Sequence, residues 1–307
     1  MRALPVIYLV LAAVSFGATF SLNKLAAEAG MPALAYAFWQ SALSGLLLLA
    51  IAVARGHRVP REPAAIKVYV LVGALGLGLP AALLTFVAPH LPSGLVTLVL
   101  ALSPPLTFLL AVAARLQAFR WLGLAGVTLG FGGILVLVAP NSGALPSPDA
   151  LGWFALCLIA PCLFATANVS AALFQPPSAD SVALAAGILL GAAAGVLPLA
   201  IVTGQIVWVP GTPGNAEIAM GLTVLIYALF TWLFLEIIRR AGPTFFAQFN
   251  YLAILAGLAW GWIVFLEPVR GAVWLALALM VTGIILLSVA NSRPATAVPG
   301  KQADVIT

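Results

Sequence analysis

Ten strongly apolar segments alternate with short polar stretches along the chain. Each is near the roughly 20 residues that an α-helix needs to cross about 30 Å of hydrocarbon. The pattern therefore predicts ten membrane-spanning helices. We expect them at residues 5–27, 32–54, 65–87, 92–114, 119–139, 150–171, 180–203, 215–238, 243–265 and 270–290.

The second group of five segments repeats the first about 150 residues later. Three matched features mark the repeat, namely a glycine-led apolar run (133–137 and 283–287), an arginine (Arg120 and Arg270) and a proline (Pro92 and Pro243). Because five is odd, the second unit enters the membrane from the opposite side, which is the inverted-repeat plan of many transporters. We expect repeats at 1–142 and 143–292, followed by a disordered cytoplasmic tail at 293–307.

The apolar runs are continuous, unlike the alternating segments of about ten residues that build membrane barrels. The chain is 64% hydrophobic and 7% charged, with a mean hydropathy of +1.17, whereas soluble domains carry about a quarter charged residues. These values predict an all-α polytopic membrane protein and exclude a soluble globular enzyme. No small-residue cleavage site closes the first apolar segment, so we expect a retained helix instead of a signal peptide.

Lys and Arg are divided unevenly between the two sides of the predicted bundle. With the N-terminus in the cytoplasm, only Lys24 and Arg270, of 13 basic residues, fall on the outer side. Since cytoplasmic loops collect Lys and Arg, this predicts that both termini are cytoplasmic. The net charge of +5 then reflects topology and attraction to anionic lipid, and it requires no nucleic acid.

Enzymatic and metal-binding motifs are absent from the sequence. It contains no His-Glu-x-x-His, Walker or Gly-x-Ser-x-Gly motif, and its two histidines are His57 and His90. Cys157 and Cys162 lie five residues apart in one span, where they point to different helix faces, so a disulfide is not expected. We expect no enzyme, no cofactor and no metal site.

The eight acidic residues all fall in loops, near span ends or in the tail. Cation-coupled transporters commonly place a carboxylate at depth in the membrane. Its absence favours facilitated movement of a substrate. Asn, Ser, Thr and backbone carbonyl groups could still bind sodium, so a coupling ion stays open.

Lys24 lies within the first span, about 12 Å outward of its middle at 1.5 Å per residue. Glu28 follows four residues later, where a Lys-Glu pair can form on one helix face. One interpretation is that Lys24 extends to the outer headgroups. The other is that Lys24 and Asn23 polarise the outer mouth of a pathway and hold a substrate carboxylate.

Prolines mark positions where the helices are expected to open. Pro104 lies at the centre of the fourth span, Pro161 at the centre of the sixth, and Pro80 outward of the centre of the third. Each removes a helix hydrogen bond and frees a carbonyl group. Pro104 and Pro161 are therefore candidate hinges, although structural kinks explain them equally. Small residues let helices approach closely, so close helix contacts are expected at Gly73, Gly76 and Gly78.

Aromatic and polar side chains in the spans form a candidate substrate cavity, because pockets combine apolar walls with a few hydrogen-bonding groups. The candidates are Phe16, Thr19, Asn23, Lys24, Phe86, Ser103, Phe164, Asn168, Tyr227, Gln248, Asn250, Tyr251 and Trp260. The amides are the stronger candidates, because an amide in hydrocarbon is costly unless it faces a cavity or a partner. A single aromatic residue is more often a packing residue.

With these features the chain resembles the drug/metabolite transporter superfamily, in its ten-helix EamA family, over about residues 5–290. The resemblance rests on the repeat, the glycine-ended fifth and tenth helices, and the segments Ser15-Phe16-Gly17-Ala18-Thr19-Phe20 and Ser103-Pro104-Pro105-Leu106. Phe16 stands where members commonly carry Trp. Gln117 occupies the acidic position that follows the fourth helix, and Glu267-Pro268 fits the one that follows the ninth.

Within the family, the chain most resembles bacterial inner-membrane exporters of aromatic amino acids, the YddG type. The resemblance implies export of Phe, Tyr and Trp, and also of Thr, homoserine or other amino acids, by alternating access in a monomer or homodimer. The first, third, fourth, sixth, eighth and ninth helices would line the cavity. Two alternatives stay open. One is an exporter of drugs or other metabolites, including nucleotide sugars; the other is a channel or scaffold without a transport cycle.

Overall fold

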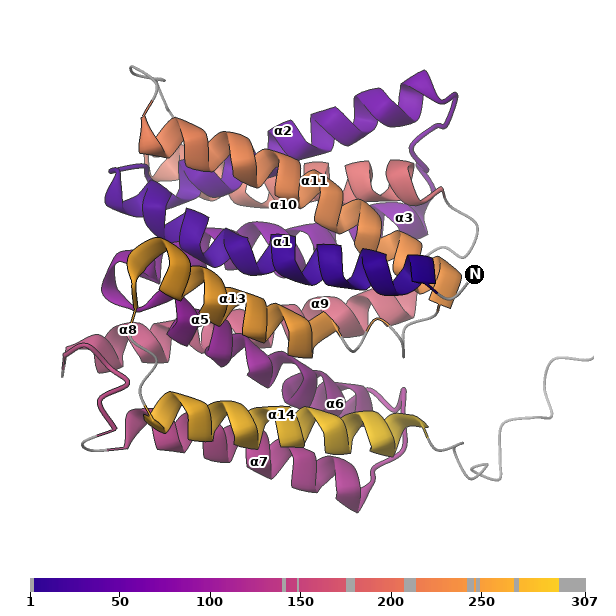
Figure 1. The fold of residues 1–307 in the computed structure, drawn as a ribbon. Coiled ribbons are helices and arrows are strands. Elements are labelled where there is room, and N and C mark those ends of the chain that lie inside the picture. The colour runs from indigo at the N-terminus through magenta and orange to yellow at the C-terminus, as the bar shows by residue number, and fades with distance from the viewer. Residues whose placement is uncertain are drawn as a thin grey trace, which may run out of the picture.

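A computed structural model describes residues 3–139, 142–147, 149–174, 180–206, 214–241, 246, 249–267 and 271–292. These residues form a bundle of helices and contain no β-strand (Figure 1). Nine of the described helices or helical runs are long and apolar enough to cross a membrane, and a shorter apolar helix covers 249–265. The predicted all-α polytopic fold is confirmed.

Four helical pieces build the third span, three build the fourth and two build the sixth. In chain order the elements are α1 (Ala3–Glu28), α2 (Ala33–Ala54), α3 (Pro63–Val68), η1 (Tyr69–Gly78), α4 (Leu79–Val87), η2 (Ala88–His90), α5 (Ser93–Val99), η3 (Leu100–Leu102), α6 (Ser103–Ala113), α7 (Trp121–Val138), α8 (Ala150–Cys157), α9 (Ile159–Phe174), α10 (Ser181–Val202), α11 (Asn215–Ala241), α13 (Phe249–Phe265) and α14 (Gly271–Ser292). The start of the predicted ninth span, residues 243–245, lies outside the described residues.

The broken spans change geometry just before their prolines. A proline ring clashes with the carbonyl group four residues earlier, so the helix must deviate there. Pro104 follows the 3₁₀ turn η3 in the fourth span, and Pro161 follows the break between α8 and α9. Pro80 follows η1, which is a π-helix. The structure therefore interrupts the helices where the prolines predict it.

The two groups of five spans pack in a repeated pattern. In Figure 1, α1 lies between α11 and α13, while α7 lies beside α14. Elsewhere in the bundle, α9 packs against η1 and α6, and α2 packs against α10. If each of the first five spans is exchanged with its counterpart among the last five, the pair α1–α11 becomes α9–η1 and the pair α1–α13 becomes α9–α6. The pairs α7–α14 and α2–α10 are converted into themselves. This is the arrangement expected of two repeats related by a pseudo-two-fold axis.

The predicted close contacts of the third-span glycines are confirmed. A Cβ atom on Gly73 would collide with the carbonyl oxygen of Ile188 in α10. On Gly78 it would lie 2.5 Å from the carbonyl oxygen of Ala192, and on Gly76 it would lie 2.9 Å from the Cβ atom of Ala167. Since these contacts involve backbone or Cβ atoms, glycine allows the third span to approach α10 and α9.

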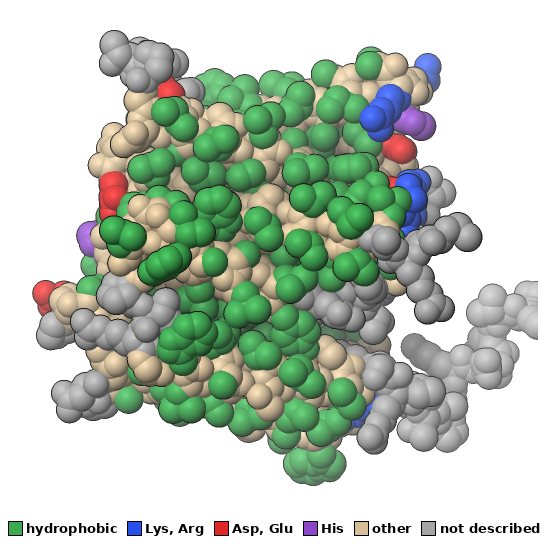
Figure 2. Space-filling view, viewed as in Figure 1, with side chains coloured by type: hydrophobic (Ala, Val, Ile, Leu, Met, Phe, Trp, Pro, Cys, Tyr) green, Lys and Arg blue, Asp and Glu red, His purple; other side chains and the backbone are tan. Residues whose placement is uncertain are grey.

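Charged side chains gather at the two ends of the bundle. Figure 2 shows Lys and Arg on the side where the chain begins, with a few acidic and His side chains among them, and Asp, Glu and His on the opposite side. We name the first the basic end; its loops and helix ends carry Arg55, Arg58, Arg61, Lys67, Arg115, Arg120, Arg239 and Arg240. We name the other the acidic end, which carries Glu28, Asp149, Glu217 and Glu267.

Candidate functional site

One face of the sixth span changes from buried to exposed along its length. Residues spaced three or four apart lie on one helix face. On this face Ala150, Phe154, Cys157 and Pro161 are buried, Phe164 is half-buried, and Asn168 is exposed. The opposite face is exposed at Ile159, Cys162 and Thr166. Near the basic end, α9 therefore has two accessible faces, one at Cys162 and Thr166 and one at Asn168, which contacts α6.

The fourth and ninth spans show the same change. On one face of the fourth span, Ser93 and Thr97 are buried, whereas Leu100, Pro104, Thr107 and Ala111 are half-buried. On α13, Gly261, Gly257 and Ile254 are buried and Asn250 is half-buried. All three faces are buried near the acidic end and become accessible toward the basic end. A cavity open toward the basic end would account for this shared change, and we name the space between the three faces the candidate cavity.

A polar pair lies on the wall of the candidate cavity. The Asn168 side chain donates from Nδ2 to the Thr107 hydroxyl oxygen over 3.2 Å, which joins α9 to α6. The Thr107 hydroxyl in turn donates to the carbonyl oxygen of Ser103 over 2.7 Å. No hydrogen bond within the described residues uses the Asn168 amide oxygen, so it is available as an acceptor. Thr107 was not among the sequence candidates, although it lies one turn after Ser103.

Aromatic side chains surround Phe16 of α1. Its ring lies 4.4 Å from that of Phe230 and 5.5 Å from those of Phe20 and Phe249, measured between centroids. Phe16 also contacts two hydrophobic clusters, one around α11 and α13 and one around the fourth span. Phe164 and Tyr251 are half-buried against the second of these clusters, as Phe16 is. The structure thus brings these three predicted residues to one apolar cluster.

Two of the remaining candidates, Trp260 and Tyr251, connect helices. The Thr19 hydroxyl donates to the carbonyl oxygen of Phe16 over 2.6 Å. The Trp260 indole donates to the carbonyl oxygen of Val14 over 3.0 Å, which joins α13 to α1. The Tyr251 hydroxyl lies 3.1 Å from that of Ser288 on α14. Asn23 is buried near the acidic end of α1.

Two candidates lie apart from the interior face, and one cannot be placed. Phe86 is 54% exposed and packs edge-on against Trp153, near the acidic end. Tyr227 is 5% exposed in a cluster formed with α2 and α10. Gln248 lies outside the described residues.

Lys24 pairs with a residue distant in the sequence. Its Nζ atom lies 2.7 Å from Oε1 of Glu267, beyond the end of α13, so the pairing expected with Glu28 is wrong. Glu28 is exposed at the end of α1. The i, i+4 spacing allowed the Glu28 pair, but the packing of α1 against α13 brings a second carboxylate nearer. The ammonium group of Lys24 is therefore engaged in this conformation.

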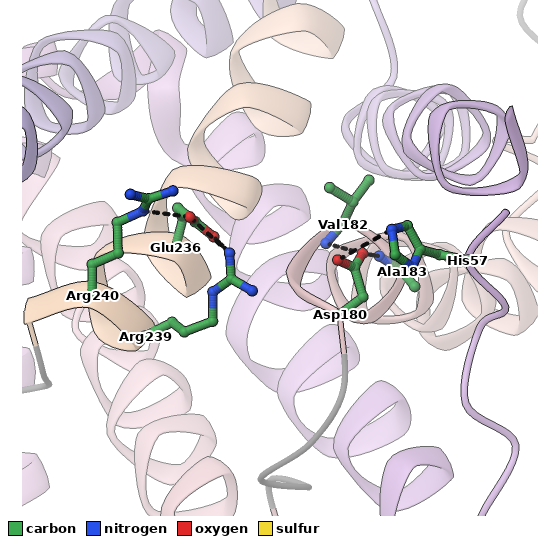
Figure 3. Close-up of polar contacts among 7 residues, drawn as sticks. All are labelled: His57, Asp180, Val182, Ala183, Glu236, Arg239 and Arg240. Atoms are coloured by element: carbon green, nitrogen blue, oxygen red, sulfur yellow. Dashed lines mark hydrogen bonds and ion pairs between the residues drawn. The ribbon is translucent and has the colours of Figure 1, made fainter. Parts of the chain in front are cut away.

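Two carboxylates near the basic end are also engaged (Figure 3). Glu236 accepts from Arg239 over 2.6 and 2.8 Å and from Arg240 over 2.5 Å, all within the last two turns of α11. Asp180 caps α10 and lies 3.9 Å from Nε2 of His57. No group of three His, Cys, Asp or Glu residues in the described part of the chain is arranged to hold a metal ion.

The fold defines a polytopic helical membrane protein. Residues 3–139, which contain the first five spans, match the model of the EamA-like transporter family. The chain is 27% identical over 285 residues to a protein from Escherichia coli K12 named "Uncharacterized inner membrane transporter YedA". This alignment covers 89% of the chain and 87% of the relative. Sequences of the same name from Escherichia coli O6:H1 and O157:H7 match equally.

A solved structure has the same fold. One chain from a crystal structure superposes with a TM-score of 0.60 at 21% sequence identity. The superposition covers 94% of this chain and 98% of the solved one. At this identity the likeness establishes the fold alone.

Proposed function

We propose that this protein is an inner-membrane transporter of the EamA-like family that exports amino acids by alternating access. The observation that carries the proposal is the change in burial shared by the fourth, sixth and ninth spans, each of which has one face that is buried near the acidic end and accessible toward the basic end. With the Asn168–Thr107 pair between two of these spans, this supports a cavity open at the basic end. A space open at one end only is what alternating access requires of each state. The family match over the first five spans and the inner-membrane relatives support the same class.

The orientation follows from charge. The basic end would face the cytoplasm, because Lys and Arg concentrate on cytoplasmic loops. The cavity would then be open to the cytoplasm, ready to receive a substrate for export. Rocking of the two halves would expose it to the other side, with the helix breaks before Pro104 and Pro161 as hinges.

The chemistry of the cavity favours a zwitterion with an apolar side chain. The Asn168 amide oxygen is placed to accept from an α-ammonium group, and the half-buried Phe164 and Phe16 offer apolar surface for the side chain. The Lys24 ammonium is engaged with Glu267. A nucleotide sugar would require cations for its phosphates, and described Lys and Arg residues lie at the helix ends and loops. An aromatic amino acid fits this wall better.

Transport is expected to proceed down the substrate gradient. Glu267 pairs with Lys24 and Glu236 with Arg239 and Arg240, and the other described carboxylates lie in loops or at helix ends. A proton- or cation-coupled cycle commonly uses a titratable group at depth. We therefore propose facilitated diffusion.

The test is uptake of labelled Phe and Thr into proteoliposomes without an ion gradient. Asn168→Ala is expected to lower kcat/KM for Phe about tenfold, since a hydrogen bond to a charged group such as the α-ammonium is worth about 1.5 kcal/mol and a tenfold effect needs about 1.4. Thr166→Ala is the matched control, because Thr166 lies on the opposite exposed face of α9 and its hydroxyl donates to Cys162. It should transport normally.

Each part of the proposal has its own contrary outcome. Uptake that appears only with an imposed proton gradient would refute facilitated diffusion. Absence of uptake for all twenty amino acids would refute the substrate class. Conductance across a planar bilayer would indicate a channel.

A further inference from the structure

The Glu267 carboxylate connects three spans at the acidic end. Its Oε1 atom lies 2.7 Å from Lys24 Nζ of α1 and accepts from the backbone N–H of Ser93 over 3.0 Å. Its Oε2 atom accepts from the Ser93 hydroxyl over 3.0 Å and from the Gly94 N–H over 3.2 Å. Both oxygen atoms are therefore engaged, and α1, α5 and the end of α13 share one carboxylate.

The end of α13 is shaped to present this carboxylate. Leu266 adopts a left-handed conformation with φ of 52°, which is unfavourable for a leucine. Its N–H still bonds to Trp262, and the N–H of Glu267 points back to the carbonyl oxygen of Gly261 over 3.4 Å. The chain thus reverses sharply before Pro268. Strained backbone of this kind persists only where surrounding contacts hold it.

Next to Glu267, on the side toward the basic end, α5 and α13 are in direct contact. A Cβ atom on Gly261 would lie 2.6 Å from the Ser93 hydroxyl, and one on Gly94 would lie 2.9 Å from the Leu258 side chain. One on Gly257 would collide with the Thr97 side chain. Thr97 is 2% exposed, so α5 and α13 are tightly packed at this contact.

We propose that Lys24, Ser93 and Glu267 form a latch that closes the acidic end of the cavity and opens once in each transport cycle. The inference rests on the proposed transport function, and it identifies the group of residues that would act as the gate of the transporter at this end. The Lys24–Glu267 pair is about 15% and 14% exposed, so neighbouring protein shields it from most of the screening by water. Charge-assisted bonds to backbone N–H groups add to it, because α5 begins with unpaired donors.

The latch has no charged equivalent at the related position of the first repeat. Glu267 aligns with Gln117, a neutral amide that donates to the carbonyl oxygen of Phe108 at 3.5 Å. A neutral amide forms weaker hydrogen bonds than a carboxylate. This asymmetry favours the state in which the acidic end is closed. The latch also gives Lys24 a role, where the sequence alone had left two interpretations, contact with lipid headgroups and substrate binding.

The test uses a cysteine reporter at the closed contact. Thr97→Cys is introduced with Cys157→Ala and Cys162→Ser, and a membrane-impermeant maleimide is applied from the acidic side. In the parent, labelling of position 97 is expected to be slow. Glu267→Gln should raise the labelling rate at least tenfold. Lys24→Met should raise it less, since Glu267 keeps its bonds to Ser93 and Gly94. Glu28→Gln, which changes an exposed carboxylate at the same end, should match the parent.

Labelling at the parent rate in Glu267→Gln would overturn the latch. If that variant elutes as an aggregate in size-exclusion chromatography, the labelling rates of Lys24→Met and Ser93→Ala are compared with that of the parent. Labelling at the parent rate in both of these variants would also overturn the latch. The readout needs no substrate. Faster labelling combined with failed amino-acid uptake would therefore keep the latch and reject the proposed substrate.

Discussion

Asp180 and Asp149 stand directly before α10 and α8, but only Asp180 acts as a cap. Asp180 is extended, with ψ of 135°, and its Oδ1 atom accepts from the N–H groups of Val182 and Ala183, both at 3.0 Å. Asp149 is helical, with ψ of −21°, and its side chain makes no capping bond. A capping side chain requires the extended conformation, because only then does it reach the free N–H groups.

Asp180→Ala is expected to lower the free energy of unfolding by about 1 kcal/mol, the usual effect of losing an N-cap. Asp149→Ala is the matched control and should change it by less than half as much. Thermal unfolding in detergent measures both. Equal losses in the two variants would contradict the capping role of Asp180.

Helix contacts in this bundle depend on glycine. At the crossing of α7 and α14, a Cβ atom on Gly283 would lie 2.6 Å from the carbonyl oxygen of Gly126 and 3.2 Å from the N atom of Gly130. Backbone atoms cannot rotate away as a side chain can. The two helices must therefore separate to admit even a methyl group. Gly132, on the same helix as Gly126, has no atom within 4 Å of its Cβ position.

Gly283→Ala is expected to destabilise the protein by about 1–3 kcal/mol, the range for overpacking. Gly132→Ala should be neutral or slightly stabilising, because alanine is the better helix former. Thermal unfolding of the two variants under identical detergent conditions makes the comparison. A Gly283→Ala protein as stable as the parent would mean that the crossing is looser than the structure indicates.

At the scale of the whole molecule, the uneven distribution of charge determines the expected orientation. The loop at the basic end contains His57, and the one after α1 at the acidic end contains Ala29; both residues are exposed. If the basic end faces the cytoplasm, each loop is accessible from one side of the membrane only.

With both native cysteines replaced, Ala29→Cys is expected to react with an impermeant maleimide in intact cells. His57→Cys should react only after the membrane is permeabilised. The opposite pattern would reverse the orientation and, with it, the side to which the cavity opens.

The candidate site was predictable in part. Asn168 was expected in a cavity because an amide in hydrocarbon is costly unless it faces a cavity or a partner, and Phe164 was expected as part of the apolar wall. Both lie on the face of α9 that continues the buried face of α8, and their part in a substrate cavity stays a prediction. Tyr227 was expected there from depth alone, yet it packs among α2 and α10. Depth is local information, whereas the direction that a side chain faces depends on which helices surround it.

By itself the sequence determined the spans, their breaks and the polarity of the two ends. Hydropathy, proline sterics and charge act over one helix or less, so they can be read locally. The tertiary structure alone decided which residues meet. Lys24 binds Glu267, 243 positions away, and not the nearby Glu28. It also decided that α5 and α13 meet closely near the acidic end, because no single segment specifies a contact between two helices.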